Sequence, residues 1–300
     1  PGKKCYLDYY QESPESAPLA IGGFLPLDTV YNYNPLPAEL TPEEQAYIIG
    51  VQANIWGEYI QTPEYFEYMA FPRLLAMSEV QWTQPEHKDF NSFAHRLDRE
   101  FGRLDYCGVN ACRNFYEVNQ TGAWNDSRQT YEVTLKTFCP DADIYYAVND
   151  STVTTSSSLY KTPIPLDEDA TIYSVAYKND RPLGKVTRKS FAVNKATGCG
   201  YTCTPEAGWE HLNNGFGLTD GRRGYARDMR RWIGFHQDSV QIVVELKKPQ
   251  KVKEVVFSSL WRPVNEIWPA RAMSVSLSMD GQTFISVGTK QLAYDFTLTE

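Results

Sequence analysis

Residues 50–58 have the sequence GVQANIWGE, and this stretch decides how the N-terminal third of the chain is interpreted. If the stretch is a strand, its alternate side chains point to opposite faces. One face is polar and aromatic, with Gln52, Asn54, Trp56 and Glu58. The other face is apolar, with Val51, Ala53 and Ile55. Such a strand suits a (β/α) barrel, in which helices cover the outer face and ligands bind at the carboxyl ends of the strands.

The N-terminus repeats the pattern in residues 4–10, KCYLDYY, where Tyr6 and Asp8 share one face of a short strand. Two neighbouring strands that each carry an aromatic residue and a carboxylate two positions apart resemble half of a sugar-binding pocket. The residue pattern by itself is explained equally well by two buried strands that carry both polar and apolar side chains and bind no ligand.

Helix signals surround the second strand. Thr41-Pro42-Glu43-Glu44 reads as a capped start with proline at the first helical position, and Thr62-Pro63-Glu64 opens a helix that should run to about Trp82. In that helix we expect an inward face formed by Phe66, Met69, Leu74, Met77 and Val80. We interpret Arg73 and Glu79 as a structural ion pair. A third helix should follow Asp89, because apolar residues recur every three or four positions up to Leu104.

Beyond about residue 115 the pattern changes to short alternating runs separated by turn residues. The runs are Tyr131–Leu135, Ile144–Val148, Thr171–Tyr177 and Lys185–Val193. This spacing is typical of a small β-sandwich.

A second β module begins near Cys199, with runs at Arg231–Phe235, Ile242–Leu246 and Val275–Val287. Asp-Gly turns between such runs indicate antiparallel hairpins. Trp261 and Trp268 could lie on loops and contact a glycan, although core packing explains them at least as well.

Composition excludes several classes of function. The net charge of −8 and the absence of a basic stripe argue against nucleic acid, and no apolar run is long enough to span a membrane. The six cysteines lack histidine at zinc-ligand spacing, so we expect no metal site among them. Cys107/Cys112 and Cys199/Cys203 are close enough to form local disulfides, whereas Cys5 and Cys139 read as buried free thiols.

The stretches CYLDYYQ, GVQANIWGEYI and EYFEYMAFPRLLAMSEVQW closely resemble the last two βα units of family 20 glycoside hydrolases, the β-N-acetylhexosaminidases. The resemblance implies that Tyr6 hydrogen-bonds the acetamido carbonyl of the substrate, that Asp8 and Glu58 hold sugar hydroxyls, and that Trp56 forms an apolar wall. Many family members have a tryptophan on the loop after the first strand. Residues 21–24 read IGGF here, so this sequence departs from the family pattern at the contact for a second sugar.

The resemblance extends to the β modules. Residues 144–166 resemble the fibronectin-like module of bacterial hexosaminidases, and the region after Cys199 resembles a discoidin-like (F5/8 type C) jelly roll. The expected fold is therefore multidomain: residues 1–115 are the C-terminal piece of a (β/α)8 TIM barrel, 116–198 a β-sandwich, and 199–300 a jelly roll that lacks its closing strands. We expect no cofactor, although the Asn213–Asp220 stretch offers oxygen ligands that could hold a structural Ca²⁺.

Family 20 enzymes use substrate-assisted, retaining catalysis, in which the 2-acetamido oxygen is the nucleophile. Their general acid is the glutamate of an Asp-Glu pair on an earlier strand, which this chain lacks. The resemblance thus implies the C-terminal fragment of a secreted or periplasmic exo-acting enzyme that releases terminal N-acetylhexosamine from glycans. This fragment should be inactive alone and should associate with its missing N-terminal part or another chain. The alternative is a non-catalytic, carbohydrate-binding accessory fragment.

Overall fold

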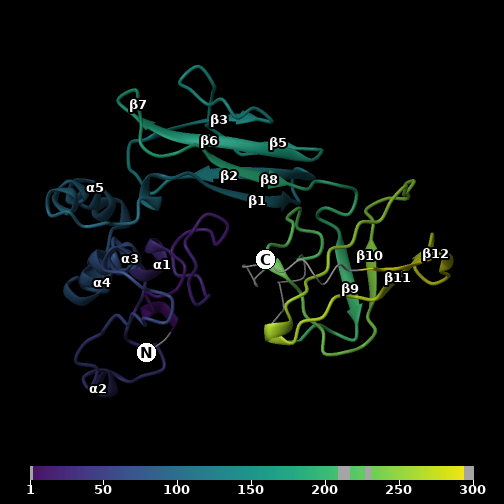
Figure 1. Ribbon diagram of the computed structural model, residues 1–300, viewed down its shortest axis with the longest axis horizontal. Helices are drawn as coiled ribbons and strands as arrows, with labels where there is room; N and C mark the ends of the chain where they lie inside the picture. The colour runs from purple at the N-terminus through teal and green to yellow at the C-terminus, as the bar shows by residue number, and fades with distance from the viewer. Residues whose placement is uncertain (1–2, 209–216, 227–230, 294–300) are drawn as a thin grey trace. The chain divides into compact units, whose positions relative to one another are not determined.

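The computed structural model describes residues 3–208, 217–226 and 231–293 (Figure 1). The chain divides into two compact units. The first comprises Pro1–Thr121, Val133–Ile164 and Thr171–Lys189, and the second comprises Gly122–Glu132, Pro165–Ala170 and Ser190–Glu300. The three-domain division expected from the sequence stays a prediction.

All α-helices of the described residues lie before residue 107. They are α1 (Leu27–Tyr31), α2 (Pro42–Gln45), α3 (Pro63–Ala70), α4 (Arg73–Trp82) and α5 (Phe90–Tyr106). The sequence-predicted caps begin three of them. Thr41 and Glu44 form a reciprocal capping box at α2, the Thr62 hydroxyl accepts the Tyr65 N–H at α3, and Asp89 caps α5. Four 3-10 turns lie among the described residues: η1 (Lys3–Cys5), η2 (Pro85–His87), η3 (Asn114–Tyr116) and η6 (Pro263–Asn265).

The single helix expected from Thr62 to Trp82 is in fact two helices. Phe71 is extended (φ −102°, ψ 142°), because the ring of Pro72 disfavours the helical conformation in the residue before it. The break resets the buried face, so Phe66 and Leu74, expected inside, are 48% and 38% exposed. The buried stripe of α4 consists of Arg73, Ala76, Met77 and Val80.

The N-terminal segment and the helices share one apolar core. Its fully buried members come from the N-terminal segment, α1, α4, α5 and the start of the β region, and include Leu7, Tyr31, Met77, Leu97 and Phe115. Val51, Ala53 and Ile55 pack against this core, as the alternation of residues 50–58 predicts.

The two expected N-terminal strands are not strands but isolated parallel bridges. Tyr6 pairs with Asn54, and Tyr10 pairs with Phe24. The N-terminal segment is thus bridged to two neighbours, and each pairing is one residue long. The (β/α)8 barrel remains a proposal.

The strand runs expected after residue 115 are confirmed. The region contains β1 (Asn119–Asn125), β2 (Thr130–Lys136), β3 (Asp143–Val148), β4 (Ser158–Leu159), β5 (Ile164–Leu166), β6 (Ala170–Lys178), β7 (Arg181–Pro182) and β8 (Thr187–Phe191). They form two sheets, β1-β2-β5 and β4-β3-β6-β7, with β8 paired to β6 (Figure 1). Asn149, Asn179 and Asp180 adopt positive φ in the turns, where Asn and Asp are the best tolerated non-glycine residues.

The C-terminal region contains two antiparallel ribbons among its described residues. One pairs β9 (Gly200–Thr204) with β10 (Gln241–Glu245), and the other pairs β11 (Ala272–Leu277) with β12 (Ile285–Gln291) around the expected Asp280-Gly281 turn. The strand expected at Arg231–Phe235 is absent. Trp232 there donates to the Tyr225 carbonyl at 2.9 Å, so its segment makes local contacts instead of a ladder.

All six cysteines lie in described residues and are free, so neither local pair forms a disulfide. Cys5 and Cys139 are buried thiols, as the sequence indicates. None of the helices in the described ranges has the length and apolar character needed to cross a bilayer.

Candidate functional site

The N-terminal bridge joins the two segments that carry the four predicted site residues. The Asn54 N–H donates to the Cys5 carbonyl at 2.8 Å, and the Leu7 N–H donates to the Asn54 carbonyl at 2.7 Å. Pairing ends at Tyr6 and Asn54, and Asp8 lies in the turn that follows Tyr6.

Asp8 is the buried member of the set, at 5% exposure. Burial raises the pKa of its carboxyl and the Glu58 carboxylate raises it further, while the N–H groups of Asp8 and Trp56 and the charge of Arg73 lower it. The influence of Glu58 and of the Trp56 N–H on Asp8 indicates that the two segments bring these residues together. Asp8 Oδ1 has no hydrogen-bond partner in the described part of the chain, so it can accept a bond from a ligand.

Tyr6 is half-buried and its ring stacks on that of Tyr9, with centroids 5.6 Å apart and an interplanar angle of 24°. Gly23 covers the Tyr9 ring: a Cβ added to Gly23 would lie 2.4 Å from it. The rings of Tyr6 and Tyr9 and the backbone of Gly23 therefore form one stack that limits where Tyr6 can point.

Trp56 and Glu58 lie on the open side. The Trp56 side chain is 58% exposed and Glu58 is exposed as well. The set thus combines an exposed indole, an exposed carboxylate, a stacked phenol and a buried carboxyl acceptor. An aromatic face with hydrogen-bonding groups around it can bind a polar ring that also has an apolar face.

Arg73 is the residue that sequence reasoning placed wrongly. It does not pair with Glu79, whose carboxylate instead takes two bonds from Arg96, at 2.5 and 2.9 Å. Arg73 is fully buried, and its guanidinium donates only to backbone carbonyls. The sequence does contain a signal for this burial: Arg73 lies three and four residues before Ala76 and Met77, so it shares their apolar face of the helix.

A second polar group consists of Glu12, Tyr68 and Cys112. The Tyr68 hydroxyl donates to Glu12 Oε1 at 2.7 Å, and burial raises the pKa of the Glu12 carboxyl. Burial and the Glu12 charge raise the pKa of the Cys112 thiol to about 12, so this thiol is not a nucleophile. The sequence contains no motif that identifies this group.

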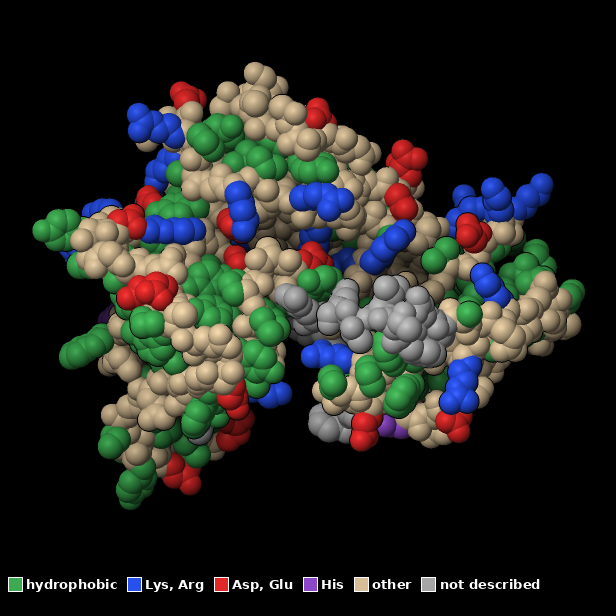
Figure 2. All heavy atoms as spheres, in the orientation of Figure 1, with side chains coloured by type: hydrophobic (Ala, Val, Ile, Leu, Met, Phe, Trp, Pro, Cys, Tyr) green, Lys and Arg blue, Asp and Glu red, His purple; other side chains and the backbone are tan. Residues whose placement is uncertain are grey.

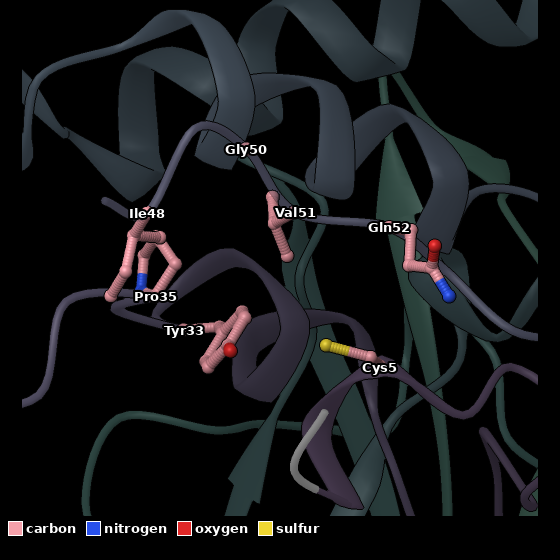
Figure 3. A pocket seen from close by; sticks show the side chains of 7 residues that line it. All are labelled: Cys5, Tyr33, Pro35, Ile48, Gly50, Val51 and Gln52. Atoms are coloured by element: carbon pink, nitrogen blue, oxygen red, sulfur yellow. The ribbon is translucent and has the colours of Figure 1, made fainter. Parts of the chain in front are cut away.

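The cavity in Figure 3 lies at the other end of the paired segments. It has a volume of about 270 Å³ and is lined by Cys5, Tyr33, Pro35, Ile48, Gly50, Val51 and Gln52. The Cys5 thiol points toward Tyr33, and burial and Cys5 raise the pKa of the Tyr33 phenol. Because it has no carboxylate or histidine, we do not assign chemistry to this cavity.

Two further predictions concern the C-terminal region, and one of them lies partly outside what the structure describes. The Asn213–Asp220 stretch is described only from residue 217, so its calcium site stays a prediction. Among the described residues no cluster of three or more His, Cys, Asp or Glu side chains could hold a metal ion. Of the two C-terminal tryptophans, Trp268 is 67% exposed and Trp261 is half-buried.

Two family models match the chain. Residues 1–85 match the glycosyl hydrolase family 20 catalytic domain, and residues 121–188 match the chitobiase/beta-hexosaminidase C-terminal domain. A beta-hexosaminidase from Porphyromonas gingivalis is 40% identical over 164 residues, which cover 53% of this chain and 20% of that protein. A beta-N-acetylhexosaminidase from Cellulomonas fimi is 32% identical over 99 residues, covering 32% of this chain and 19% of that protein.

A solved structure of a family 20 exo beta-N-acetylglucosaminidase from Vibrio harveyi, in complex with N-acetylglucosamine, is 36% identical. The match covers 37% of this chain and 18% of that one, with a TM-score of 0.33. The chain spans about a fifth of the length of the relatives it matches. The chain is therefore similar to family 20 glycosyl hydrolases at residues 1–85 and to the C-terminal domain of chitobiases and beta-hexosaminidases at residues 121–188.

Proposed function

We propose that this chain is the C-terminal part of an exo-acting β-N-acetylhexosaminidase and forms one wall of its sugar pocket. The observation that carries the proposal is the convergence next to the Tyr6–Asn54 bridge, where the buried carboxylate of Asp8 accepts from the Trp56 N–H and lies within electrostatic reach of Glu58. The beta-hexosaminidase relatives support the choice of N-acetylhexosamine as the ligand.

In the proposed reaction these residues bind and orient the sugar and do not transfer the leaving-group proton. The acetamido oxygen attacks the anomeric carbon while the bond from that carbon to the leaving oxygen breaks. The Tyr6 hydroxyl donates to the acetamido group and holds it in line, Asp8 and Glu58 accept from sugar hydroxyls, and Trp56 covers the apolar face. The proton for the leaving oxygen comes from a general acid elsewhere in the complete protein.

Steady-state kinetics on an aryl N-acetylglucosaminide test the assigned roles in the complete protein that contains this sequence. Tyr6→Phe should lower kcat by about 100-fold with little change in KM, because a donor that acts on the reacting group matters most in the transition state. Glu58→Gln should mainly raise KM, by about tenfold or more, because a charge-assisted hydrogen bond contributes about 1.5–3 kcal/mol.

Matched controls are Tyr106→Phe and Glu86→Gln, which alter exposed residues on α5 and η2. Glu86→Gln should retain wild-type kinetics, and so should Tyr106→Phe, because it keeps the apolar ring and removes only an exposed hydroxyl. Normal kcat in Tyr6→Phe would remove the acetamido-orienting role and, with it, the residue-level argument for an N-acetylated substrate.

The proposed partners are glycans ending in N-acetylhexosamine and the remaining part of the barrel, in the same protein or in another chain. Exposed apolar side chains over the N-terminal helices support the second partner (Figure 2). Tyr47, Ile49, Trp82 and Tyr106 are between 85% and 98% exposed. Clustered exposed apolar groups mark surfaces that bind other protein. The secreted or periplasmic location is also part of the proposal, and cell fractionation tests it.

A further inference from the structure

Arg73 holds the chain on both sides of Asp8. Its Nη1 donates to the Tyr9 carbonyl and its Nη2 to the Leu7 carbonyl, the two carbonyls that flank Asp8 in sequence. The same two nitrogens donate to Leu25 and Met69 carbonyls, at 3.0 and 2.6 Å. One side chain therefore ties the Leu7–Tyr9 turn to the segment after it and to α3.

We propose that Arg73 is a positioning residue for Asp8, which fixes the direction of its free carboxylate oxygen toward the sugar. This inference rests on the proposed function, because it specifies how the same pocket holds one sugar hydroxyl. Arg73 itself does not touch the ligand, since it is fully buried beneath the turn.

The chemistry of the guanidinium suits this role. Burying a cation is costly unless it is hydrogen-bonded, and four carbonyls and the nearby Asp8 charge offset that cost. Arginine presents donors in a rigid planar fork, so it fixes the carbonyls relative to one another. A lysine at this position has three rotatable donors and would leave the turn freer to move.

The alternative is that Arg73 only stabilises the core. The two roles differ at Asp8: a core residue affects all sugar contacts alike, whereas a positioning residue selectively affects the hydroxyl that Asp8 accepts. Asp8 Oδ1 is buried and has no partner among the described residues, so its bond to a ligand depends on how the backbone aims it.

A panel of monodeoxy sugars separates these roles. Dissociation constants of N-acetylglucosamine and its 3-, 4- and 6-deoxy analogues are measured by titration calorimetry on the complete protein. For each analogue the deoxy ratio is its dissociation constant divided by that of N-acetylglucosamine. The hydroxyl that donates to Asp8 is the one whose deoxy ratio is large in wild type, about tenfold or more, and close to one in Asp8→Asn. In Arg73→Lys the deoxy ratio for that hydroxyl should fall below about threefold, while the ratios for the other hydroxyls persist.

The control is Val80→Ala, which removes buried methyl groups from the same helix away from the turn. It should lower stability and retain the full ratio. If Arg73→Lys does not fold, Gly23→Ala perturbs the same turn by pressing on the Tyr9 ring, and the ratio must fall there too.

An unchanged deoxy ratio in folded Arg73→Lys overturns the positioning role and leaves the proposed function intact. An unchanged ratio in Gly23→Ala has the same meaning if that variant has to be used. A wild-type protein that binds none of these sugars overturns the proposed function instead, and the inference with it. If the wild-type protein binds the sugars but no deoxy ratio differs between wild type and Asp8→Asn, then Asp8 holds no hydroxyl, and the inference is overturned as well.

Discussion

Replacing Gly23 with alanine should damage both the fold and the sugar pocket. Gly23 has φ of +67° and its added Cβ would lie 2.4 Å from the Tyr9 ring, closer than any real contact. Positive φ costs an ordinary residue about 1–2 kcal/mol. Moving the Tyr9 ring costs about 1–3 kcal/mol more as overpacking, and losing its stack on Tyr6 costs about 0.5–1.5 kcal/mol.

Gly108→Ala is the matched control, because Gly108 has φ of +71° and open space around its missing side chain. Both variants incur the backbone cost, and only Gly23→Ala incurs the ring displacement. The difference between their free energies of unfolding should therefore be about 1.5–4.5 kcal/mol.

Urea unfolding followed by circular dichroism at 222 nm measures this difference, because the α-helices of the described residues all lie before residue 107. In the complete protein, Gly23→Ala should also lower kcat on the aryl N-acetylglucosaminide, whereas Gly108→Ala should not. Equal destabilisation by the two substitutions, within about 0.5 kcal/mol, would refute the idea that the Gly23 backbone supports the Tyr9–Tyr6 stack.

Two further predictions concern titratable groups. Burial raises the pKa of Glu12 above its ordinary 4.5. Between 4.5 and the raised pKa the native state therefore binds more protons than the unfolded state, so stability should fall as pH rises through this range. The destabilisation of wild type relative to Glu12→Gln should grow over this range in urea titrations, and a difference independent of pH would contradict it. Exposed Cys107 should react readily with an alkylating reagent in the native protein, whereas buried Cys112, with a pKa of about 12, should react only on unfolding. Mass spectrometry of the labelled peptides measures both rates, and equal native rates would be inconsistent with the structure.

The sequence predicts what depends on local interactions. The Thr41, Thr62 and Asp89 caps begin their helices as expected, because a cap is complete within four residues. The strands of the β region also lie where alternation and turn residues place them. The break at Pro72 carries a local signal as well, since a residue before proline resists the helical conformation, but the continuous apolar pattern obscures it.

The rest depends on partners that are distant in sequence. Residues 50–58 have the alternation of a strand, yet within the described residues their pairing is the one bridge from Asn54 to Tyr6. The partners of Arg73 are carbonyls up to 66 residues away, which no side-chain pattern reveals. The convergence of Asp8 with Trp56 depends on the bridge between Tyr6 and Asn54, two residues that are 48 positions apart in the sequence.

A crystal structure of the complete protein with N-acetylglucosamine tests the central claim most directly. We predict one sugar beside the Tyr6–Asn54 bridge, with the Tyr6 hydroxyl donating to the acetamido carbonyl, the Asp8 and Glu58 carboxylates accepting from ring hydroxyls, and the Trp56 ring against an apolar face. A sugar bound elsewhere, for example in the cavity between Cys5 and Tyr33, with these four side chains free of contact, would contradict it.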